Sequence, residues 1–288
     1  MTPPSTGSAR AVSRLRVAFI TNANAEDVHL IRRVAEEHDV VGIIRPAKRS
    51  KPPKRRHFSP AQKLRRVLRG KVYARYYDYL DASIADHLFA GPAPAVDPVP
   101  IDIPSDLIND AETRALVRSW RPDVLILSGA PILKPALFSI PKVTINVHMG
   151  LSPDYRGEHT LFVPLARGDY ARIAGTLHRV DAGVDTGPVL ARVYPELSPT
   201  DSEPVLIARV MRMIGDVTVD FLSDLTFGRA HAESGGFPSV SDAATPTPDT
   251  GFNIRYHDRR LRQDAMLLAR RFVGHGPPRR PSRIELHY

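Results

Sequence analysis

Arg16-Val-Ala-Phe-Ile-Thr21 is a short apolar run, and Val40-Val-Gly-Ile-Ile44 is a second one. Such runs, bounded by turn residues, are typical of buried strands. The segment between them carries apolar residues at helical spacing, among them Val28, Ile31 and Val34. The order strand, helix, strand indicates a β-α-β unit, in which Pro46 is expected to end the second strand. We therefore predict an α/β fold built on a mostly parallel sheet.

The same alternation continues along the chain. Further apolar runs predict strands at 124–127, 143–148, 173–180 and 189–194, and amphipathic patterns predict helices at 108–120, 204–225 and 263–273. We expect a disordered leader over residues 1–15 and a Rossmann-like domain over 16–200, its sheet flanked by helices. Residues 46–104 are interpreted as an inserted basic helical arm, and residues 201–288 as a small C-terminal extension of helix, loop (229–250) and tail.

Composition excludes several classes of protein. The 288 residues are 42% hydrophobic and 25% charged, as in ordinary globular proteins. No apolar run approaches the roughly 20 residues that span a bilayer, and the N-terminus lacks the apolar segment of a secretory signal. We expect a cytoplasmic protein without a membrane partner. The chain has no cysteine, so its chemistry cannot use thiolates or cysteine-built metal sites.

A basic run lies inside the predicted arm. Residues 48–71 contain no Asp or Glu, and their cations are Lys48, Arg49, Lys51, Lys54, Arg55, Arg56, Lys63, Arg65, Arg66, Arg69 and Lys71. With a formal net charge of +9, this run favours an anionic partner, because a positive surface concentrates anions. A solvated basic face is the alternative. Nucleic acid is the less favoured partner, since no known binding motif accompanies the run.

Asn146 and His148 stand two residues apart at the end of a predicted buried strand, so their side chains point to one face of the sheet. Left unsatisfied there, each polar group would cost about 1–3 kcal/mol. One interpretation is a pair of hydrogen-bonded core residues. The other is a functional pair, because ligands of parallel α/β sheets bind at the C-terminal ends of the strands.

Four further segments bear on that choice. They are Arg121-Pro-Asp-Val-Leu-Ile-Leu-Ser-Gly-Ala-Pro-Ile-Leu133, Pro153-Asp-Tyr-Arg-Gly157, Gly175-Thr-Leu-His178 and Val184-Asp-Thr-Gly-Pro188. Together with Ile145-Asn-Val-His148, and in this order, they resemble the folate-dependent formyltransferases. The resemblance covers the chain well from Arg121 to about Arg192 and only loosely before Lys48. It implies the formyltransferase fold.

The resemblance implies a catalytic trio of Asn146, His148 and Asp185. They would transfer a formyl group from 10-formyltetrahydrofolate to the primary amine of a small acceptor. Asn146 and a protonated His148 would donate hydrogen bonds to the oxyanion of the tetrahedral intermediate, each typically worth about 10²–10³ in rate. Asp185 would orient His148, which exchanges protons near neutral pH. His178 is interpreted as structural. A metal triad of His148, His159 and His178 lacks a known ligand spacing, so no metal is expected.

The resemblance also implies where the co-substrate binds. The pterin would lie against two main-chain segments, whose residues are Ser128, Gly129, Ala130, Ile132 and Leu133, and Val180, Asp181 and Val184. The turn residues Tyr155, Arg156 and Gly157 would contact the acceptor. Ordinary turn formation is the alternative explanation for the glycines.

Departures from the family pattern bear on the acceptor. Gly150 and Ser152 replace the usual Ser and Leu, and the first loop reads Asn22-Ala-Asn-Ala-Glu26 instead of a glycine–serine phosphate loop. Too little periodic sequence follows Leu225 for an added β-barrel domain. An amino sugar, nucleotide-linked, or a secondary-metabolite amine remains as acceptor. Formyltetrahydrofolate hydrolysis and non-catalytic anion binding are alternatives, and a homodimer stays open.

Overall fold

The computed structural model of the protein describes residues 14–49, 59–157, 160–229 and 276–288. Most of the predicted leader, the loop at 230–250, the helix at 263–273, and Arg55, Arg56 and His159 lie outside the described residues. Two residues assigned to the leader are held on the body of the protein. Arg14 pairs with Asp39 at 2.7 Å, and the carbonyl of Leu15 accepts a hydrogen bond from the Asp39 amide.

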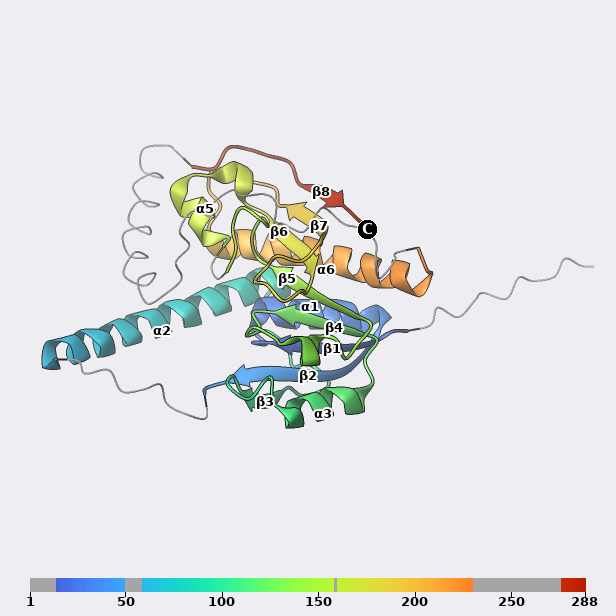
Figure 1. Ribbon diagram of the computed structural model, residues 1–288. Helices are drawn as coiled ribbons and strands as arrows, with labels where there is room; N and C mark the ends of the chain where they lie inside the picture. The colour runs from blue at the N-terminus through green and yellow to red at the C-terminus, as the bar shows by residue number, and fades with distance from the viewer. Residues whose placement is uncertain (1–13, 50–58, 158–159, 230–275) are drawn as a thin grey trace, which may run out of the picture.

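An eight-stranded sheet forms the centre of the molecule, in the order β3-β2-β1-β4-β5-β6-β7-β8 (Figure 1). The strands are β1 (Arg16–Thr21), β2 (Asp39–Ala47), β3 (Ile101–Pro104), β4 (Val124–Ser128), β5 (Val143–His148), β6 (Gly175–Arg179), β7 (Val189–Tyr194) and β8 (Arg283–Leu286). Strands β1 to β5 pair in parallel, and β6 to β8 continue the sheet antiparallel. The predicted α/β fold with a mostly parallel sheet is confirmed.

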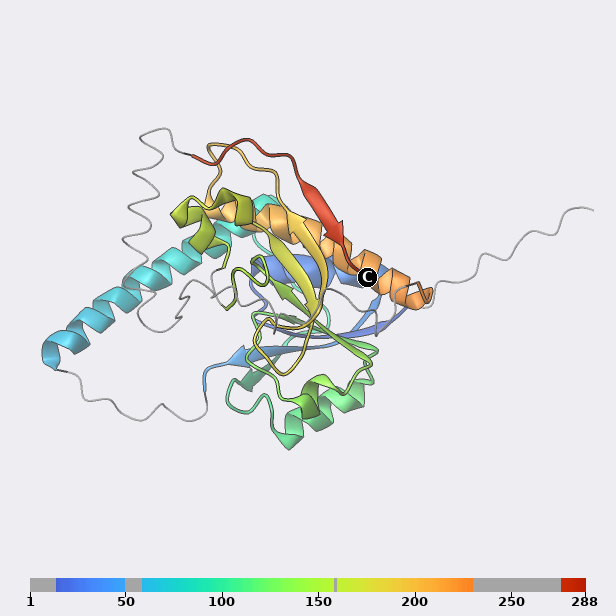
Figure 2. The same cartoon turned by 45° about the horizontal axis from the view of Figure 1, so that its top comes forward.

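Helices cover both faces of the sheet. The helices are α1 (Ala25–Glu37), α2 (Pro60–Phe89), α3 (Ala111–Trp120), α4 (Pro135–Phe138), α5 (Phe162–Arg167) and α6 (Glu203–Thr226). Helices α1 and α6 share one core with the sheet, and α3 and α4 share the core on its other face (Figure 2). Helix α6 belongs to this layer because Leu206, Val210, Ile214, Val217 and Phe221 form a stripe at helical spacing, and all five are buried.

Helix α2 connects β2 to β3 and has two different halves. Its second half packs on α1, where Leu80, Ile84 and Ala85 surround Ala25. Its first half projects away from the rest of the molecule (Figure 1). The described part of the predicted insertion 46–104 thus comprises a projecting half-helix, a packed half-helix and the edge strand β3.

Three details of the sheet differ from the sequence-based expectation. Strands β3 and β8 were not predicted, and Pro46 lies inside β2 instead of ending it. The pairing of β2 with β1 stops at Ile44, and Pro46 faces only Ile103 of β3. A proline is tolerated there because its missing N–H is not needed by a strand on the other side.

The topology places a switch point at the carboxyl edge of the sheet. Strand β1 lies between β2 and β4, so successive connections leave it in opposite directions. In open α/β sheets, ligands bind outside the carboxyl ends of the strands at such a point. Strand β1 ends there at Thr21, β4 at Ser128 and β5 at His148. No helix of the described residues has the length and apolar character needed to cross a membrane.

Candidate active site

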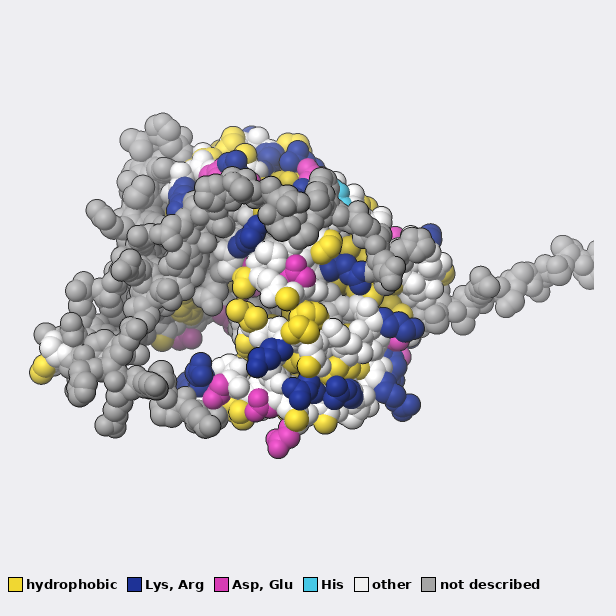
Figure 3. Space-filling model, in the orientation of Figure 1, with side chains coloured by type: hydrophobic (Ala, Val, Ile, Leu, Met, Phe, Trp, Pro, Cys, Tyr) yellow, Lys and Arg dark blue, Asp and Glu magenta, His cyan; other side chains and the backbone are white. Residues whose placement is uncertain are grey.

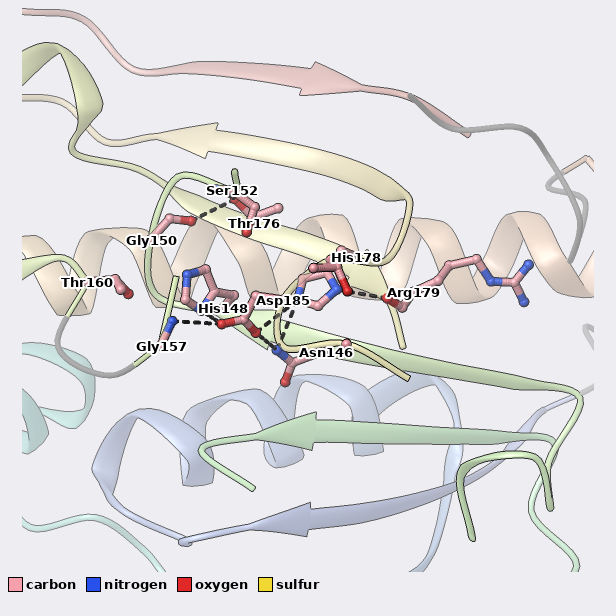
Figure 4. Close-up of polar contacts among 12 residues, drawn as sticks. Asn146, His148, Gly150, Ser152, Gly157, Thr160, Thr176, His178, Arg179 and Asp185 are labelled. Carbon is pink, nitrogen blue, oxygen red and sulfur yellow. Dashed lines mark hydrogen bonds and ion pairs between the residues drawn. The ribbon is translucent and has the colours of Figure 1, made fainter. Parts of the chain in front are cut away.

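Strand β5 places Asn146 and His148 on one face of the sheet, the same face as Leu127 of the neighbouring strand. Asn146 is half-buried and His148 is buried, with 5% of its surface exposed. The predicted pair therefore lies at the carboxyl edge of the sheet. Figure 4 shows both side chains directed towards Asp185, which comes from the loop between β6 and β7.

That loop turns back sharply enough to bring Asp185 over β5. Asp185 has a φ of 51°, in the left-handed region that few residues other than glycine adopt. Gly187 passes so close to the carbonyl of Arg179 that any side chain would collide with it. Asp181 closes the loop from inside, since its Oδ1 accepts hydrogen bonds from the amide of Gly183 and the hydroxyl of Thr186. The loop is therefore shaped by its own contacts.

The two carboxylate oxygens of Asp185 have different partners. Oδ1 accepts a hydrogen bond from Nδ2 of Asn146 at 3.2 Å, and Oδ2 accepts one from the backbone amide of Gly157 at 2.9 Å. Nδ1 of His148 lies 3.6 Å from Oδ2, and Nε2 of His178 lies 3.5 Å from Oδ1. The carboxylate thus stands between two imidazole rings (Figure 4).

The surroundings of Asp185 favour its ionised form. Burial alone would raise its pKa, but the neighbouring rings of His178 and His148 and the Gly157 amide together hold the pKa well below the usual range. Asp185 is therefore a carboxylate at neutral pH. It can accept hydrogen bonds and stabilise a positive charge on an imidazole ring.

His148 is held in one neutral form. Its Nε2 lies 2.7 Å from the carbonyl oxygen of Tyr155, and a carbonyl can only accept, so Nε2 carries the hydrogen. In the neutral ring Nδ1 is then the bare nitrogen, and it faces Asp185. Burial lowers the pKa of His148, and the nearby carboxylate only partly opposes this. The expected protonated His148 that reaches an oxyanion does not agree with this arrangement, because both ring nitrogens face protein.

Asn146 also differs from the expectation. Its Nδ2 donates to Asp185 and lies 3.0 Å from Nε2 of His178. The amide nitrogen that was expected to face an oxyanion thus contacts Asp185 and His178 instead. His178, interpreted from the sequence as structural, is in direct contact with two members of the trio. Its place opposite Asn146 follows from the antiparallel register of β5 and β6, which the sequence did not specify.

The predicted co-substrate segments flank an apolar cluster on the same face as Asn146. Leu127 and Leu133 are buried in this cluster, and Ala130 and Val180 pack against it. Ile132 and Val184 are large apolar residues that remain 68% and 47% exposed. Exposed apolar side chains beside a buried apolar cluster are typical of a ligand-binding surface.

The remaining members of the two segments shape the backbone. Gly129 has a φ of 64°, and its carbonyl accepts a hydrogen bond from Nδ2 of Asn22. Ser128 turns its hydroxyl to the opposite face of the sheet, where it donates to Asp27 at 2.5 Å. Only the main chain of Ser128 can therefore face the side of the sheet on which Asn146 lies.

The three residues of the turn predicted to contact the acceptor, 155–157, have different surroundings. Tyr155 is 3% exposed, and its hydroxyl donates to Asp169 at 2.7 Å. Its side chain is not available to a substrate, contrary to the prediction, and it acts on the site through its carbonyl and His148. Gly157 contributes its amide to Asp185. The Nε of Arg156 is shielded from solvent and has no hydrogen-bond partner among the described residues.

An acidic cluster at the start of α1, formed by Glu26, Asp27 and Asp81, was not predicted. Burial and the charges of Asp27 and Asp81 raise the pKa of Glu26, and burial raises that of Asp27. Asp81 of α2 accepts a hydrogen bond from the amide of Ala25. The sequence signal was the adjacent Glu26 and Asp27 at a helix start, which also fits an ordinary exposed first turn. In the described part of the chain, no three His, Asp or Glu side chains are arranged to hold a metal ion.

The chain is similar in sequence to known formyltransferases. The methionyl-tRNA formyltransferase of Microcystis aeruginosa (strain NIES-843 / IAM M-2473) is 30% identical over 152 residues, which cover 52% of this chain and 45% of that protein. The methionyl-tRNA formyltransferase of Dehalococcoides mccartyi (strain CBDB1) is 31% identical over 121 residues, 41% of this chain and 38% of that protein. The chain therefore spans less than half the length of these relatives.

The fold has solved counterparts. The structure of a phosphoribosylglycinamide formyltransferase from Anaplasma phagocytophilum superposes with a TM-score of 0.51 at 15% identity, covering 80% of this chain and 96% of that one. A family model described as formyl transferase matches residues 16–221, which is more than half of the chain. The trio, two residues of β5 and one of the loop between β6 and β7, lies inside the matched residues, and we conclude that the chain belongs to the formyl transferase family.

Proposed function

We propose that the protein transfers the formyl group of 10-formyltetrahydrofolate to the primary amine of a small acceptor. The observation that carries the proposal is the convergence of Asn146, His148 and Asp185 at the carboxyl edge of the sheet, in a chain of this family. A neutral imidazole beside an ionised carboxylate can take up and return a proton during attack by an amine.

The apolar surface beside the trio fits a folate. Leu127 and Leu133 provide its floor, and the exposed side chains of Ile132 and Val184 can pack on the faces of a flat ring. Main-chain groups of residues 128–133 and 180–185 would hold the polar edge of the ring. When bound, the folate supplies the activated formyl group.

The reaction has a simple proton balance. A bond forms between the acceptor nitrogen and the formyl carbon, the bond from that carbon to the folate nitrogen breaks, and the amine proton ends on the folate nitrogen. The carboxylate of Asp185 accepts a hydrogen bond from an N–H of the attacking amine, directly or through a water molecule. His148 takes up a proton at Nδ1, where Asp185 stabilises the resulting imidazolium. Its Nε2–H stays on the carbonyl of Tyr155 throughout.

For the acceptor we propose an anionic amine, such as a nucleotide-linked amino sugar. Helix α2 is the next element after β2 along the chain. Its first half projects from the body and carries Lys63, Arg65, Arg66, Arg69 and Lys71. Arginine and lysine bind diphosphates through charge-assisted hydrogen bonds. Arg156, whose Nε has no partner among the described residues, supports the same class of acceptor from the turn beside Asp185.

The test is an incubation of the full chain with 10-formyltetrahydrofolate and a panel of amines, followed by mass spectrometry of the products. The panel contains amino sugars, free and nucleotide-linked, and amines without a phosphate. We expect an N-formylated product with at least one anionic amine, and far slower formation of that product by the Asp185→Asn variant. Folate release without any amine would show a hydrolase, and no turnover with any amine would overturn the proposal.

A further inference from the structure

Strand β8 is the last strand at one end of the sheet, so one of its sides pairs with β7 and the other is an open edge (Figures 1 and 2). The amide of His287, just after β8, donates a hydrogen bond to the carbonyl of Leu190. Residues of an antiparallel strand turn their backbone groups alternately to the two sides. Glu285 therefore also turns its N–H and C=O towards β7, whereas Ile284 and Leu286 turn theirs to the open edge.

The side chains of the same two residues are apolar and exposed. Ile284 is 49% exposed and Leu286 is 55% exposed. Their partners on β7, Val193 and Ala191, are fully buried in the core that the sheet shares with α6. The apolar face of the sheet thus continues beyond the buried core onto β8.

The strand at the other end of the sheet is protected against further pairing. Pro100 immediately precedes β3 and Pro104 is its last residue, and a proline has no N–H to donate to an added strand. Asp102 in the middle of β3 is charged and pairs with Arg45 at 2.6 Å. Prolines and charges of this kind are common devices that keep an edge strand from pairing. The residues of β8 that present their backbone to the open edge are apolar instead.

We propose that the open edge of β8 pairs with the β8 edge of a second copy of this chain, antiparallel and across a two-fold axis at Ile284. Ile284 would stand opposite Ile284 of the second copy and exchange both of its backbone hydrogen bonds with it. Arg283 would stand opposite Glu285 of the second copy, and Glu285 opposite its Arg283. The same surface serves both copies, as in other two-fold dimers.

The charges of β8 favour this register. With the axis at Ile284, each dimer contains two pairs of opposite charge. An axis at Glu285 would place its carboxylate directly opposite the same carboxylate, which is destabilising. Both charged side chains are already held beside one ring, because the Arg283 guanidinium lies 4.0 Å from the centre of the Tyr194 ring and the Tyr194 hydroxyl donates to Glu285 at 3.3 Å.

The apolar side chains support the same arrangement. In the proposed pair, Ile284 contacts Ile284 of the second copy, and Leu286 lies diagonal to it, within reach on the same face. The exposed surface of both residues would be removed from water, which favours association. The inference does not use the proposed function, and its test needs no turnover.

The first test is the mass of the full chain in solution, measured by sedimentation. We expect a dimer for the native chain and a monomer for Ile284→Lys, with Ile101→Lys on β3 as the matched control that leaves the dimer intact. Arg283→Glu and Glu285→Arg should each weaken the dimer about tenfold or more, since each puts like charges opposite twice. The double variant Arg283→Glu with Glu285→Arg keeps the net charge and should restore the dimer. A double variant as weak as the singles would contradict the register.

The second test reads the register directly, because the chain has no cysteine of its own. Two residues opposite each other in a hydrogen-bonded antiparallel pair have Cα atoms about 5.5 Å apart, within the range of a disulfide. Ile284→Cys should therefore form a covalent dimer under mild oxidation, much faster than Ile101→Cys. Faster cross-linking of Glu285→Cys would overturn the axis at Ile284. A native chain that stays monomeric up to its limit of solubility, or a dimer that Ile284→Lys leaves intact, would overturn the whole inference.

Discussion

At the scale of single residues, Asp185 has the most contacts in the site, because it receives hydrogen bonds from Asn146 and Gly157 and faces two imidazoles. Asp185→Asn keeps the shape of the side chain and removes the charge. We expect it to reduce kcat by about 10²–10⁴, the usual contribution of acid–base catalysis, with a small change in melting temperature. The measurement is steady-state formyl transfer, with Glu112→Gln on the exposed first turn of α3 as the control.

The trio should also behave as one unit. Asn146→Ala, His148→Ala and Asp185→Ala are each expected to remove most of the activity, and the triple variant should be hardly worse than the weakest single one. Losses that multiply across the three variants would show that the residues act in separate steps.

Burial of His148 predicts a pH dependence of stability. Its pKa in the folded protein is lowered, chiefly by burial, so the unfolded chain takes up the proton first. The stabilisation is therefore complete above the unfolded pKa of about 6.5 and is lost as the pH falls below it. We expect the melting temperature to decrease from pH 7 to pH 5 less steeply in His148→Gln than in the native protein. If the melting temperatures of the native protein and of His148→Gln fell equally with pH, the lowered pKa of His148 would be contradicted.

At the scale of elements, the start of α1 should show the opposite dependence. Burial and the charges of Asp27 and Asp81 raise the pKa of Glu26 to about 8, from an ordinary value of 4.5. A raised acid is protonated more in the folded than in the unfolded state, so its stabilisation is full below pH 4.5 and is lost as the pH rises to about 8. Glu26→Gln should therefore raise the melting temperature at pH 8 relative to the native protein, and by less at pH 5.

The packing of α3 on β2 gives a second prediction for an element. The ring of Trp120 lies directly on the backbone of Gly42, where any side chain would collide with it. Gly42→Val should destabilise the fold by about 1–3 kcal/mol through overpacking, measured by urea denaturation. The double variant Gly42→Val with Trp120→Leu provides the control, since the smaller side chain should recover part of the loss.

Elements with strong local patterns were predictable, and those that depend on distant partners were not. Strands β1 and β4 contain continuous apolar runs, β5 is rich in β-branched residues, and α6 has a full stripe of buried apolar residues. Strands β3 and β8 have four residues each, lie at the two edges and contain exposed or polar positions. Their conformation comes from hydrogen bonds to a neighbour, which no short window of sequence records.

The same distinction applies to the site. Asn146, His148 and Asp185 followed from ordered motifs. The contact of His178 with Asn146 depends on the register of β6 against β5, and the raised pKa of Glu26 depends in part on the charge of Asp81, which lies on another helix. A histidine on an apolar strand and an acidic pair at a helix start both have ordinary structural explanations, so the sequence alone could not distinguish them.

At the scale of the whole molecule, positive charge is present in more than one place. Lys and Arg side chains gather over α3 on the face seen in Figure 3, where Arg118 is exposed. The basic run of α2 lies instead on the half-helix that projects from the body, as Figures 1 and 2 show. A net charge of +9 alone would attract anions to both surfaces, so only a local test can separate them.

If the arm binds the acceptor, Arg65→Gln, Arg66→Gln and Arg69→Gln together should raise the KM for an anionic acceptor. The KM for the folate should stay the same, because the arm is not part of the apolar surface proposed to bind the folate. The native KM for the acceptor should increase with salt, and the triple variant should depend on salt less, since fewer screened charges remain.

The matched control removes three exposed arginines that lie outside the arm, with Arg32→Gln, Arg118→Gln and Arg279→Gln. This variant has the same net charge as the arm variant, so it reports the effect of overall charge on the encounter with an anion. An equal rise of KM in both variants would mean that long-range attraction, and not the arm, recruits the acceptor. A rise confined to the arm variant assigns the first half of α2 to acceptor binding, because only the position of the lost charges differs between the two proteins.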